Sequence, residues 1–396
     1  MEHPLLVLAF DKFRGSLTQA EASEAAEKGV RRALPEAEVV ILPCADGGEG
    51  TVEAILAACG TGRKRYTCSV TPPLGIPGKE SIEASFAVLS GEDGVRTCVL
   101  EMCAASGLSL VPEDRRDPMS ASTYGTGQMI RAGLDLGCRR FLLGLGGSAT
   151  HDGGIGMAAA LGYRFYDRQG NFIPFPKGSD LPELGSIRTD EADPRLRNSA
   201  FTACCDVDNP LCGPSGAAAV FGPQKGAIPE QIPKMDEGLA HLAQILTETG
   251  MQDCREQPGV GAAGGTGFGV RAFLGGELKS GIDAVLDAAK ADDILRKADL
   301  LLTGEGKMDI QTVHGKAVAG LLSRAERFGV PVIGFCGILE DGAWGLYDRG
   351  MIGMFSISDR PMGKKDAFLR AKALLEKQVY SAVTLWYRSK TQKRRK

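Results

Sequence analysis

The stretch "LLVLAFDKFRGSLTQAEASEAAEKGVRRALPEAEVVILP" (residues 5–43) predicts the fold class of this chain. It opens with six apolar residues that are typical of a buried strand, and a polar loop follows them. Thr18 and Glu21 form a capping box, which marks the start of a helix, and Pro35 marks its end. A second apolar segment completes a strand–helix–strand order, which is typical of a parallel sheet.

The same order of elements returns near the C-terminus. The segment "ADLLLTGEGKMD" (298–309) precedes a helical pattern and a further apolar strand. Pro-rich turns and long loops break up the region between the two ends. Because the termini of a domain often lie close together, one domain can be built from both chain ends. We therefore predict an α/β fold in which residues 1–65 and 285–396 form one domain and residues 66–284 form an inserted second one.

The bulk composition is that of an ordinary globular protein. The chain has 396 residues, of which 43% are hydrophobic and 24% charged, and its formal net charge is -3. This balance does not indicate a nucleic-acid partner, and the basic run at 388–396 is expected to be a solvated tail. No segment reaches the roughly 20 apolar residues of a membrane span, and no signal-peptide pattern opens the chain. We therefore expect a cytoplasmic protein with no membrane partner.

Cysteine and histidine do not indicate a metal site built from sulfur and nitrogen ligands. The 11 cysteines include no Cys-x-x-Cys pair, and the 4 histidines are not spaced as zinc ligands. Cys98 and Cys336 lie inside apolar runs, where they are expected to be small core residues. A cation bound by oxygen ligands, such as magnesium, remains open because carboxylates are plentiful.

Three polar, glycine-containing loops follow strand-like segments. They are "DKFRGS" (11–16), "ADGGEGT" (45–51) and "TGEGKMD" (303–309). Ligands of open parallel sheets bind beyond the carboxyl ends of the strands, and glycine lets the backbone approach a ligand closely. Any one loop could be an ordinary turn, but the three together predict a binding site.

A fourth cluster, "GLGGSATHDGGIGMAAALG" (144–162), follows an apolar strand and precedes an Ala-rich helix. Backbone amides and the dipole at a helix N-terminus attract anions. We interpret the cluster as a cradle for phosphate groups, in which Ser148 and Thr150 add hydroxyl donors. The alternative is close packing of the helix on the strand through small residues.

The common nucleotide-binding fingerprints are not met. The sequence contains no G-x-x-x-x-G-K-[ST] motif. A G-x-G-x-x-G pattern occurs at Gly259, Gly261 and Gly264, but it follows a polar segment rather than a strand. Its context therefore does not match that of a dinucleotide-binding turn.

Asp206 and Asp208 directly follow the short apolar segment "FTACC" (201–205). Two carboxylates at this spacing, beside Asn209, suit the coordination of a hard cation. The alternative is an Asx turn that precedes Pro210.

Six motifs in order resemble the bacterial glycerate kinase family, of the glycerate 2-kinase type. They are "DKFRGSL", "ADGGEGT", "GLGGSATHDGGIGM", "CDVDNPLCGPSGAAAVFGPQKGA", "GAAGGTGFG" and "TGEGKMDIQTVHGK". The resemblance extends from about Leu5 to about Ser381. It implies a Rossmann-like domain with a second, distinct α/β domain. It also implies transfer of the γ-phosphoryl group of ATP to D-glycerate with Mg²⁺, which yields 2-phosphoglycerate.

Three positions depart from the family pattern. Lys12 stands where the family usually has serine, Arg14 where it has lysine, and His151 where it has asparagine. A positive charge remains at position 14, although guanidinium and ammonium groups bind anions with different geometry. The departures leave the reaction class unchanged and bear on substrate recognition.

The motifs supply a set of candidate site residues. Asp46 is interpreted as the general base, and Lys12 and Arg14 as cations for the glycerate carboxylate or the γ-phosphate. The predicted substrate contacts are Asp11, Ser16, Gly47, Gly48, Glu49, Glu305 and Asp309. The predicted contacts of the ATP phosphates are Gly146, Gly147, Ser148, Asp152 and Gly153, and the predicted metal ligands are Asp206 and Asp208. Which acid is the base and which acids bind metal stays open, because the sequence gives no distances.

Other functions fit the sequence less well. A kinase that forms 3-phosphoglycerate, or that uses another small hydroxy acid, is an alternative within the same class. A hydroxy-acid oxidoreductase would need a dinucleotide fingerprint in its proper context. A non-catalytic sugar-acid sensor would be expected to lack the loop acids and to carry an output module. The expected partners are small molecules, and a homodimer is left open.

Overall fold

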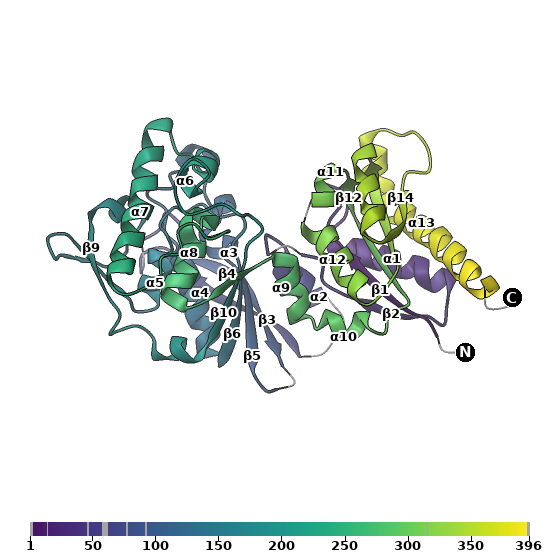
Figure 1. Ribbon diagram of the computed structural model, residues 1–396, viewed down its shortest axis with the longest axis horizontal. Coiled ribbons are helices and arrows are strands. Elements are labelled where there is room, and N and C mark those ends of the chain that lie inside the picture. Colours follow the sequence, from purple (N-terminus) through teal and green to yellow (C-terminus); the bar gives the residue numbers. More distant parts are fainter. Residues whose placement is uncertain are drawn as a thin grey trace. The chain divides into compact units, whose positions relative to one another are not determined.

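A computed structural model describes residues 3–13, 15–45, 47–57, 62–76, 78–91, 93–314 and 316–393 of the chain (Figure 1). It contains two compact units. The first comprises Met1–Ala45, Glu53–Gly60 and Val285–Lys396, and the second comprises Asp46–Val52 and Thr61–Ala284. The first unit thus draws on both ends of the chain. The predicted domain boundaries stay a prediction, and the two compact units differ from them in assigning residues 46–52 and 61–65 to the second unit.

The first unit is built on a parallel sheet. Its five strands follow the order β14-β13-β12-β1-β2, and every neighbouring pair is parallel. Strands of this kind are covered on both faces and therefore appear as continuous apolar runs. The strands are β1 (Leu5–Phe10), β2 (Glu38–Ile41), β12 (Leu300–Met308), β13 (Val332–Leu339) and β14 (Met351–Ser356).

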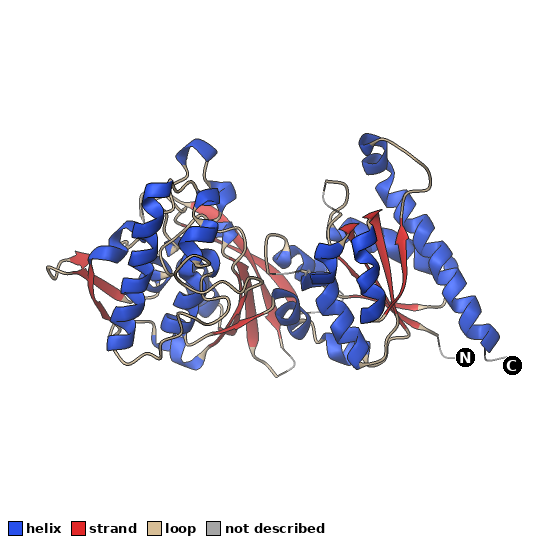
Figure 2. Ribbon diagram, turned by 45° about the horizontal axis from the view of Figure 1, so that its top comes forward, coloured by secondary structure: helices blue, strands red, loops and turns tan. Residues whose placement is uncertain are grey.

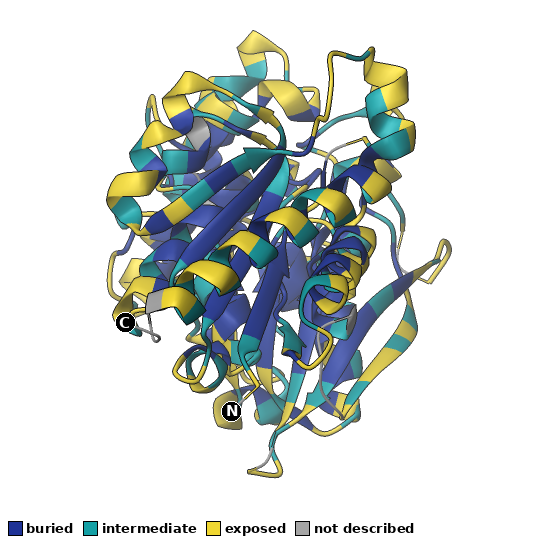
Figure 3. Ribbon diagram, turned by 90° about the vertical axis from the view of Figure 1, so that its right-hand side faces the viewer, coloured by how far each residue is buried: buried dark blue, intermediate teal, exposed yellow. Residues whose placement is uncertain are grey.

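Helices cover this sheet, and they carry their exposed residues on the outer side, as Figure 3 shows. At the start of α1 (Gln19–Ala33), Thr18 Oγ1 accepts a hydrogen bond from the Glu21 backbone N–H at 3.2 Å. The Glu21 carboxylate accepts one from the Thr18 N–H at 2.9 Å, which confirms the predicted capping box. The other helical segments of this unit are α10 (Ala291–Leu295), α11 (Ile310–His314), α12 (Lys316–Arg327), η7 (Asp341–Arg349) and α13 (Lys364–Lys393). Two more helices, α2 (Thr51–Ala57) and α9 (Gly281–Ala288), begin in residues assigned to the second unit and end in residues assigned to the first.

The second unit is built on a mixed sheet (Figure 2). Its six strands follow the order β11-β10-β6-β5-β4-β3, in which β11, β10, β6 and β5 are parallel and the β5–β4 and β4–β3 pairs are antiparallel. The strands are β3 (Arg63–Val70), β4 (Ile82–Ser90), β5 (Arg96–Glu101), β6 (Cys138–Gly144), β10 (Ala200–Cys204) and β11 (Glu277–Lys279). A small antiparallel sheet, in the order β8-β7-β9, contains β7 (Arg164–Asp167), β8 (Phe172–Ile173) and β9 (Leu184–Arg188).

Helices and short 3₁₀ turns complete the second unit. The helices are α3 (Cys103–Ser106), α4 (Tyr124–Asp135), α5 (Ile155–Ala160), α6 (Ala217–Phe221), α7 (Ile232–Glu248) and α8 (Ala262–Leu274). All six residues of α5, the Ala-rich helix of the fourth glycine cluster, are buried. Within the described ranges, no helix has both the length and the apolar character that a membrane span requires. The predicted α/β class is confirmed.

Candidate functional site

The carboxyl edge of the mixed sheet gathers the ends of three neighbouring parallel strands. Glu101 at the end of β5 pairs with Gly144 at the end of β6, and Cys204 at the end of β10 pairs with the same glycine. Ligands of parallel sheets bind at this edge. The loop that leaves β6 there is the start of the fourth glycine cluster.

The described part of the "ADGGEGT" loop packs directly on this edge. A Cβ atom added to Gly144 would lie 2.1 Å from the carbonyl oxygen of Gly47, and one added to Gly146 would lie 2.8 Å from the Cα atom of Gly48. Gly47 has a φ of +80°, and its own Cβ would lie 2.1 Å from the Cβ of Cys204. Only glycine allows two backbones to approach so closely. The structure therefore brings Gly47 and Gly48, predicted substrate contacts, beside Gly146, a predicted phosphate contact.

Glu101 holds this loop in place, a role that the sequence analysis missed. Its Oε1 atom accepts hydrogen bonds from the backbone N–H groups of Gly50, at 3.1 Å, and Val52, at 2.7 Å. These groups belong to the start of α2, where amides need an acceptor. Burial raises the pKa of Glu101, although the two backbone hydrogen bonds oppose that shift. The feature of the sequence that could have indicated this role is the position of Glu101, an acidic residue at the end of an apolar strand.

The tip of the loop that follows β6, Gly146–Ser148, is fixed by backbone hydrogen bonds to the residues around α3. The Gly147 carbonyl accepts a hydrogen bond from the Leu108 N–H at 2.8 Å, and the Ala149 N–H donates to the Ser106 carbonyl at 2.9 Å. Gly147 itself is exposed and has a φ of +72°. The loop thus presents glycine backbone to solvent on a fixed support, which suits close approach of an anion.

A buried lysine lies beneath this loop. The ammonium of Lys225 donates to Ser148 Oγ at 2.8 Å and to the Thr150 carbonyl at 2.7 Å. Burial lowers the pKa of Lys225 to about 7, although Asp152 opposes the shift. The neighbouring His151 is also buried, and burial together with Lys225 lowers its pKa to about 3.

Asp152 and Gly153 lie in the core rather than at the loop tip. Asp152 Oδ2 accepts from the N–H and the hydroxyl of Thr123, both at 2.8 Å, and from the Gly156 N–H at 3.3 Å. Its Oδ1 accepts from the Gly154 N–H at 3.1 Å, so the carboxylate already occupies the N-terminus of α5. A Cβ at Gly153 would lie 2.5 Å from a methyl group of Leu242. Their phosphate contacts stay a prediction, and their burial favours a structural role.

The G-x-G-x-x-G pattern also serves packing. A Cβ on Gly264 would lie 2.1 Å from the Thr150 carbonyl oxygen, and one on Gly261 would lie 2.1 Å from that of Pro210. The Gly264 carbonyl accepts a hydrogen bond from the Gly153 N–H at 3.0 Å. These glycines therefore support the fourth cluster from behind, in keeping with a pattern that lacks the context of a dinucleotide turn.

Asp206 and Asp208 have different surroundings. Asp206 Oδ1 accepts from the Gly281 N–H at 3.0 Å and from Ser280 Oγ at 3.4 Å, at the start of α9. Asp208 is exposed. In the part of the chain that the structure describes, no group of three or more His, Cys, Asp or Glu side chains is placed to hold a metal ion. The assignment of these two acids as metal ligands stays a prediction.

In the first unit, two predicted substrate contacts lie side by side where β1 ends. Asp11 directly follows β1, and its N–H donates to the Gly304 carbonyl of β12 at 2.9 Å. Glu305 is the next residue of β12, which continues to Met308, so residues 303–308 of the predicted loop belong to a strand. Asp11 Oδ1 also accepts from Gln19 Nε2 at 3.1 Å, which fixes it against α1.

The remaining predicted residues of the first unit lie in turns nearby in the chain. Asp309 Oδ1 accepts from the Thr312 N–H at 3.3 Å at the start of α11, and its other oxygen lies 3.0 Å from Lys307 Nζ. Ser16 Oγ donates to the Phe13 carbonyl at 3.0 Å, and Lys12 is exposed.

Two predicted catalytic residues, Asp46 and Arg14, lie outside the described residues. Glu49, the remaining predicted substrate contact, is exposed. Its negative charge lies close enough to Glu101 to raise the pKa of Glu101 further. The roles of all three residues stay predictions.

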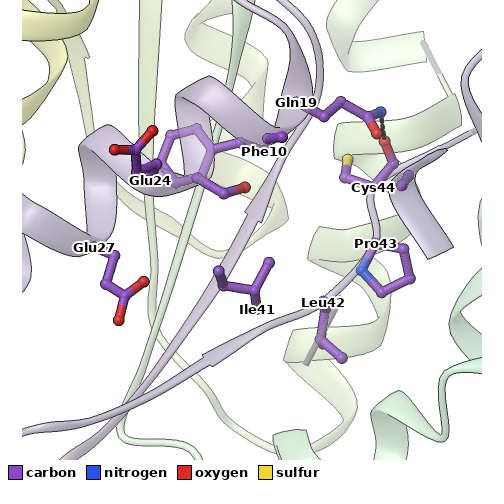
Figure 4. Close-up of a pocket in the computed structure, with 11 residues that line it drawn as sticks. Phe10, Gln19, Glu24, Glu27, Ile41, Leu42, Pro43 and Cys44 are labelled. Atoms are coloured by element: carbon purple, nitrogen blue, oxygen red, sulfur yellow. Dashed lines mark hydrogen bonds between the residues drawn. The ribbon is translucent and has the colours of Figure 1, made fainter. Parts of the chain in front are cut away.

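A groove between α1 and the β1–β2 region of the first unit does not suit the anionic substrates of a kinase (Figure 4). Glu24 and Glu27 lie at one end, and at the other Gln19 Nε2 donates to the Cys44 carbonyl. The described residues that line it include no lysine or arginine, so its charge would repel a carboxylate or a phosphate.

Comparison with known proteins finds relatives along nearly the whole chain. The model of the glycerate kinase family matches residues 6–387. A Bacillus subtilis (strain 168) protein named glycerate kinase is 44% identical over 372 residues, which cover 94% of this chain and 95% of that protein. An Escherichia coli (strain K12) protein named glycerate 2-kinase is 44% identical over 352 residues, which cover 89% of this chain and 90% of that protein.

A solved structure shares the fold. The crystal structure of a Salmonella typhimurium LT2 protein, assigned as glycerate kinase 2, superposes with a TM-score of 0.87 at 38% sequence identity. The match covers 98% of this chain and 100% of that one. The family resemblance read from six motifs is confirmed.

Proposed function

Since this chain belongs to the glycerate kinase family, we propose that it transfers the γ-phosphoryl group of ATP to O2 of D-glycerate and forms 2-phosphoglycerate. It is a kinase of glycerate, and the observation that favours O2 is its similarity to the relative named glycerate 2-kinase. We place the reaction in the cytoplasm.

Phosphoryl transfer requires positioning and compensation of negative charge more than covalent chemistry by the protein. The carboxyl edge of the sheet in the second unit offers both. The exposed backbone of Gly147, on a fixed loop, can position a phosphate, and the ammonium of Lys225 beneath that loop can compensate its charge. We assign the ATP phosphates to the loop Gly146–Ser148.

The other roles follow the sequence-based assignment. Asp46 accepts the proton of the glycerate hydroxyl, and Lys12 and Arg14 compensate the charge of carboxylate or phosphate. Asp206 and Asp208 offer the carboxylate oxygens that Mg²⁺ prefers, and the ion when bound neutralises phosphate charge. Contacts to glycerate are assigned to Asp11, Ser16, Gly47, Gly48, Glu49, Glu305 and Asp309.

One experiment tests the reaction and its position. The purified protein is mixed with ATP, Mg²⁺ and D-glycerate, and the splitting of the product's ³¹P signal by the protons of the phosphorylated carbon identifies that carbon by NMR. A doublet from the single proton on C2 is the expected result, with L-glycerate as the matched control. A triplet from the two protons on C3 would overturn the assignment to O2, and the absence of a phosphorylated product would overturn the function.

A further inference from the structure

Lys225 occupies a position that packing alone does not explain. It ends the turn η5 (Pro223–Lys225), and only 2% of it is exposed. Burying an ammonium is unfavourable, and an apolar side chain of similar length would avoid that cost. The hydrogen bonds to Ser148 and Thr150 offset part of it. The lysine therefore supplies the loop with hydrogen-bond donors and a positive charge, which an apolar side chain would not.

The direction of the hydrogen bond to Ser148 has a chemical consequence. In its charged form Lys225 has three donors and no acceptor, so Ser148 Oγ then accepts from Lys225. The hydroxyl proton of Ser148 is then left to be donated in another direction. Ser148 directly follows the exposed Gly147, at the tip to which we assign the phosphates.

We propose that Lys225 is a positioning residue for nucleotide phosphate, because it turns the Ser148 hydroxyl into a donor toward the Gly146–Ser148 loop and places positive charge beneath that loop. The inference rests on the proposed function, since it takes the anion at this loop to be the phosphate chain of ATP. Lys225 acts through Ser148 and the local field, and it does not touch the reacting atoms.

The charges around Lys225 are compatible with this role. Asp152 is the acid that favours its charged form, and His151 is held neutral by burial. An incoming phosphate chain adds negative charge, which also favours the charged form of Lys225.

The test compares ADP binding, measured by calorimetry, in four proteins: wild type, Lys225→Met, Ser148→Ala and the double variant. Loss of Lys225 should weaken ADP binding by roughly 10-fold and leave the KM for glycerate within about twofold, because a hydrogen bond to a charged phosphate is lost. Ser148→Ala should weaken binding several-fold in the wild type but by less than about twofold in the Lys225→Met background. Lys234→Met, an exposed lysine of α7, is the matched control and should bind ADP normally.

Two results would overturn the inference. One is unchanged ADP affinity in folded Lys225→Met, and the other is an equal cost of Ser148→Ala in both backgrounds. If Lys225→Met does not fold, the inference is tested instead by measuring proton uptake when the wild type binds ADP. At pH 8, ADP binding should be accompanied by proton uptake onto Lys225, which calorimetry in buffers of different ionisation enthalpy detects, and no uptake would contradict the role. If the wild type binds ADP with these properties but phosphorylates no glycerate, only the proposed function fails.

Discussion

The two sheets of this protein both carry polar, glycine-containing segments on their carboxyl side, yet the segments are built differently. In the first unit, Asp11 directly follows β1, and Glu305 lies at the same level within β12, which continues to Met308. In the second unit, the edge is a junction of backbones, where Gly47 and Gly48 pack on Gly144 and Gly146. The same pattern in the sequence, a strand followed by glycine and acid, therefore indicates a rim of side chains in one case and a close main-chain contact in the other.

The largest expected effect is at the main-chain junction. Gly144→Ala adds a Cβ that would lie 2.1 Å from the Gly47 carbonyl oxygen, a contact that neither backbone can relieve without moving its loop. We expect a loss of about 3 kcal/mol in unfolding free energy, the upper range for overpacking. Thermal and urea unfolding measure this loss.

The control for Gly144 is a glycine with room around it. Gly363 has no heavy atom within 4 Å of an added Cβ, so Gly363→Ala should change stability by less than about 0.5 kcal/mol. If Gly144→Ala proved as stable as this control, the junction would not require glycine, and the contrast between the two edges would be lost.

The next effect is a loss of unfolding free energy at acidic pH, to which the buried His151 contributes. Its pKa in the folded protein is about 3, below the ordinary 6.5, so the unfolded chain binds an additional proton between these pH values. Unfolding free energy should therefore fall as the pH drops from 6.5, by about 1.4 kcal/mol per unit and about 2 kcal/mol at pH 5.

His151→Asn, which introduces the residue that the family resemblance implies at this position, isolates this effect. The variant should lose less stability than the wild type between pH 7 and pH 5, as measured by unfolding in urea at each pH. Burial raises the pKa of Asp152 and of Glu101, which acts in the opposite sense, but both residues are common to the two proteins. Parallel pH profiles would contradict the assignment to His151.

Local signals made the first unit easier to predict than the site in the second. The capping box of Thr18 and Glu21 involves residues three apart, and the apolar runs of β1 and β12 define buried strands by themselves. Lys225 and Ser148 are 77 residues apart. No spacing rule connects two such residues, because only the packed sheet brings them together.

The fourth glycine cluster shows the same limit. Its sequence predicted one anion cradle, whereas the structure separates an exposed tip at Gly147 from a buried carboxylate at Asp152. The separation follows from α5, whose six residues are all buried and whose N-terminus is occupied by Asp152. Helix burial depends on what packs against the helix, here α4 and α8, and a local pattern does not contain that information.

A smaller effect is expected at the exposed loop tip. Gly147→Val introduces a β-branched side chain at a φ of +72° and blocks close approach to the backbone. We expect the apparent ATP affinity to fall by about 10-fold, and the KM for glycerate to change much less, since the assigned ligand of this loop is the phosphate chain.

Calorimetric ATP titration beside a melting curve separates binding from folding at Gly147. Gly137→Val is a matched control, because Gly137 also has a positive φ, +79°, and no heavy atom within 4 Å of an added Cβ. It should lose stability without losing ATP affinity. If Gly147→Val lost stability and kept its affinity, the phosphates would have to be sought at the "TGEGKMD" segment of the first unit instead.

The smallest effect is expected in the first unit, where the structure depends on a local signal. Thr18→Ala removes the hydroxyl that accepts from the Glu21 N–H, and loss of such a cap costs about 1 kcal/mol. Because Thr18 lies at the start of α1 and the groups of the second unit do not depend on it, ADP affinity should be unchanged. Thr18→Ser keeps the acceptor and should recover most of the stability. Urea unfolding and calorimetry on the three proteins test both halves of the statement. If Thr18→Ala instead lost ADP affinity that Thr18→Ser did not restore, the cap of α1 would be coupled to the nucleotide loop. That result would contradict the contrast between a first unit specified by local sequence signals and a loop shaped by residues distant in sequence.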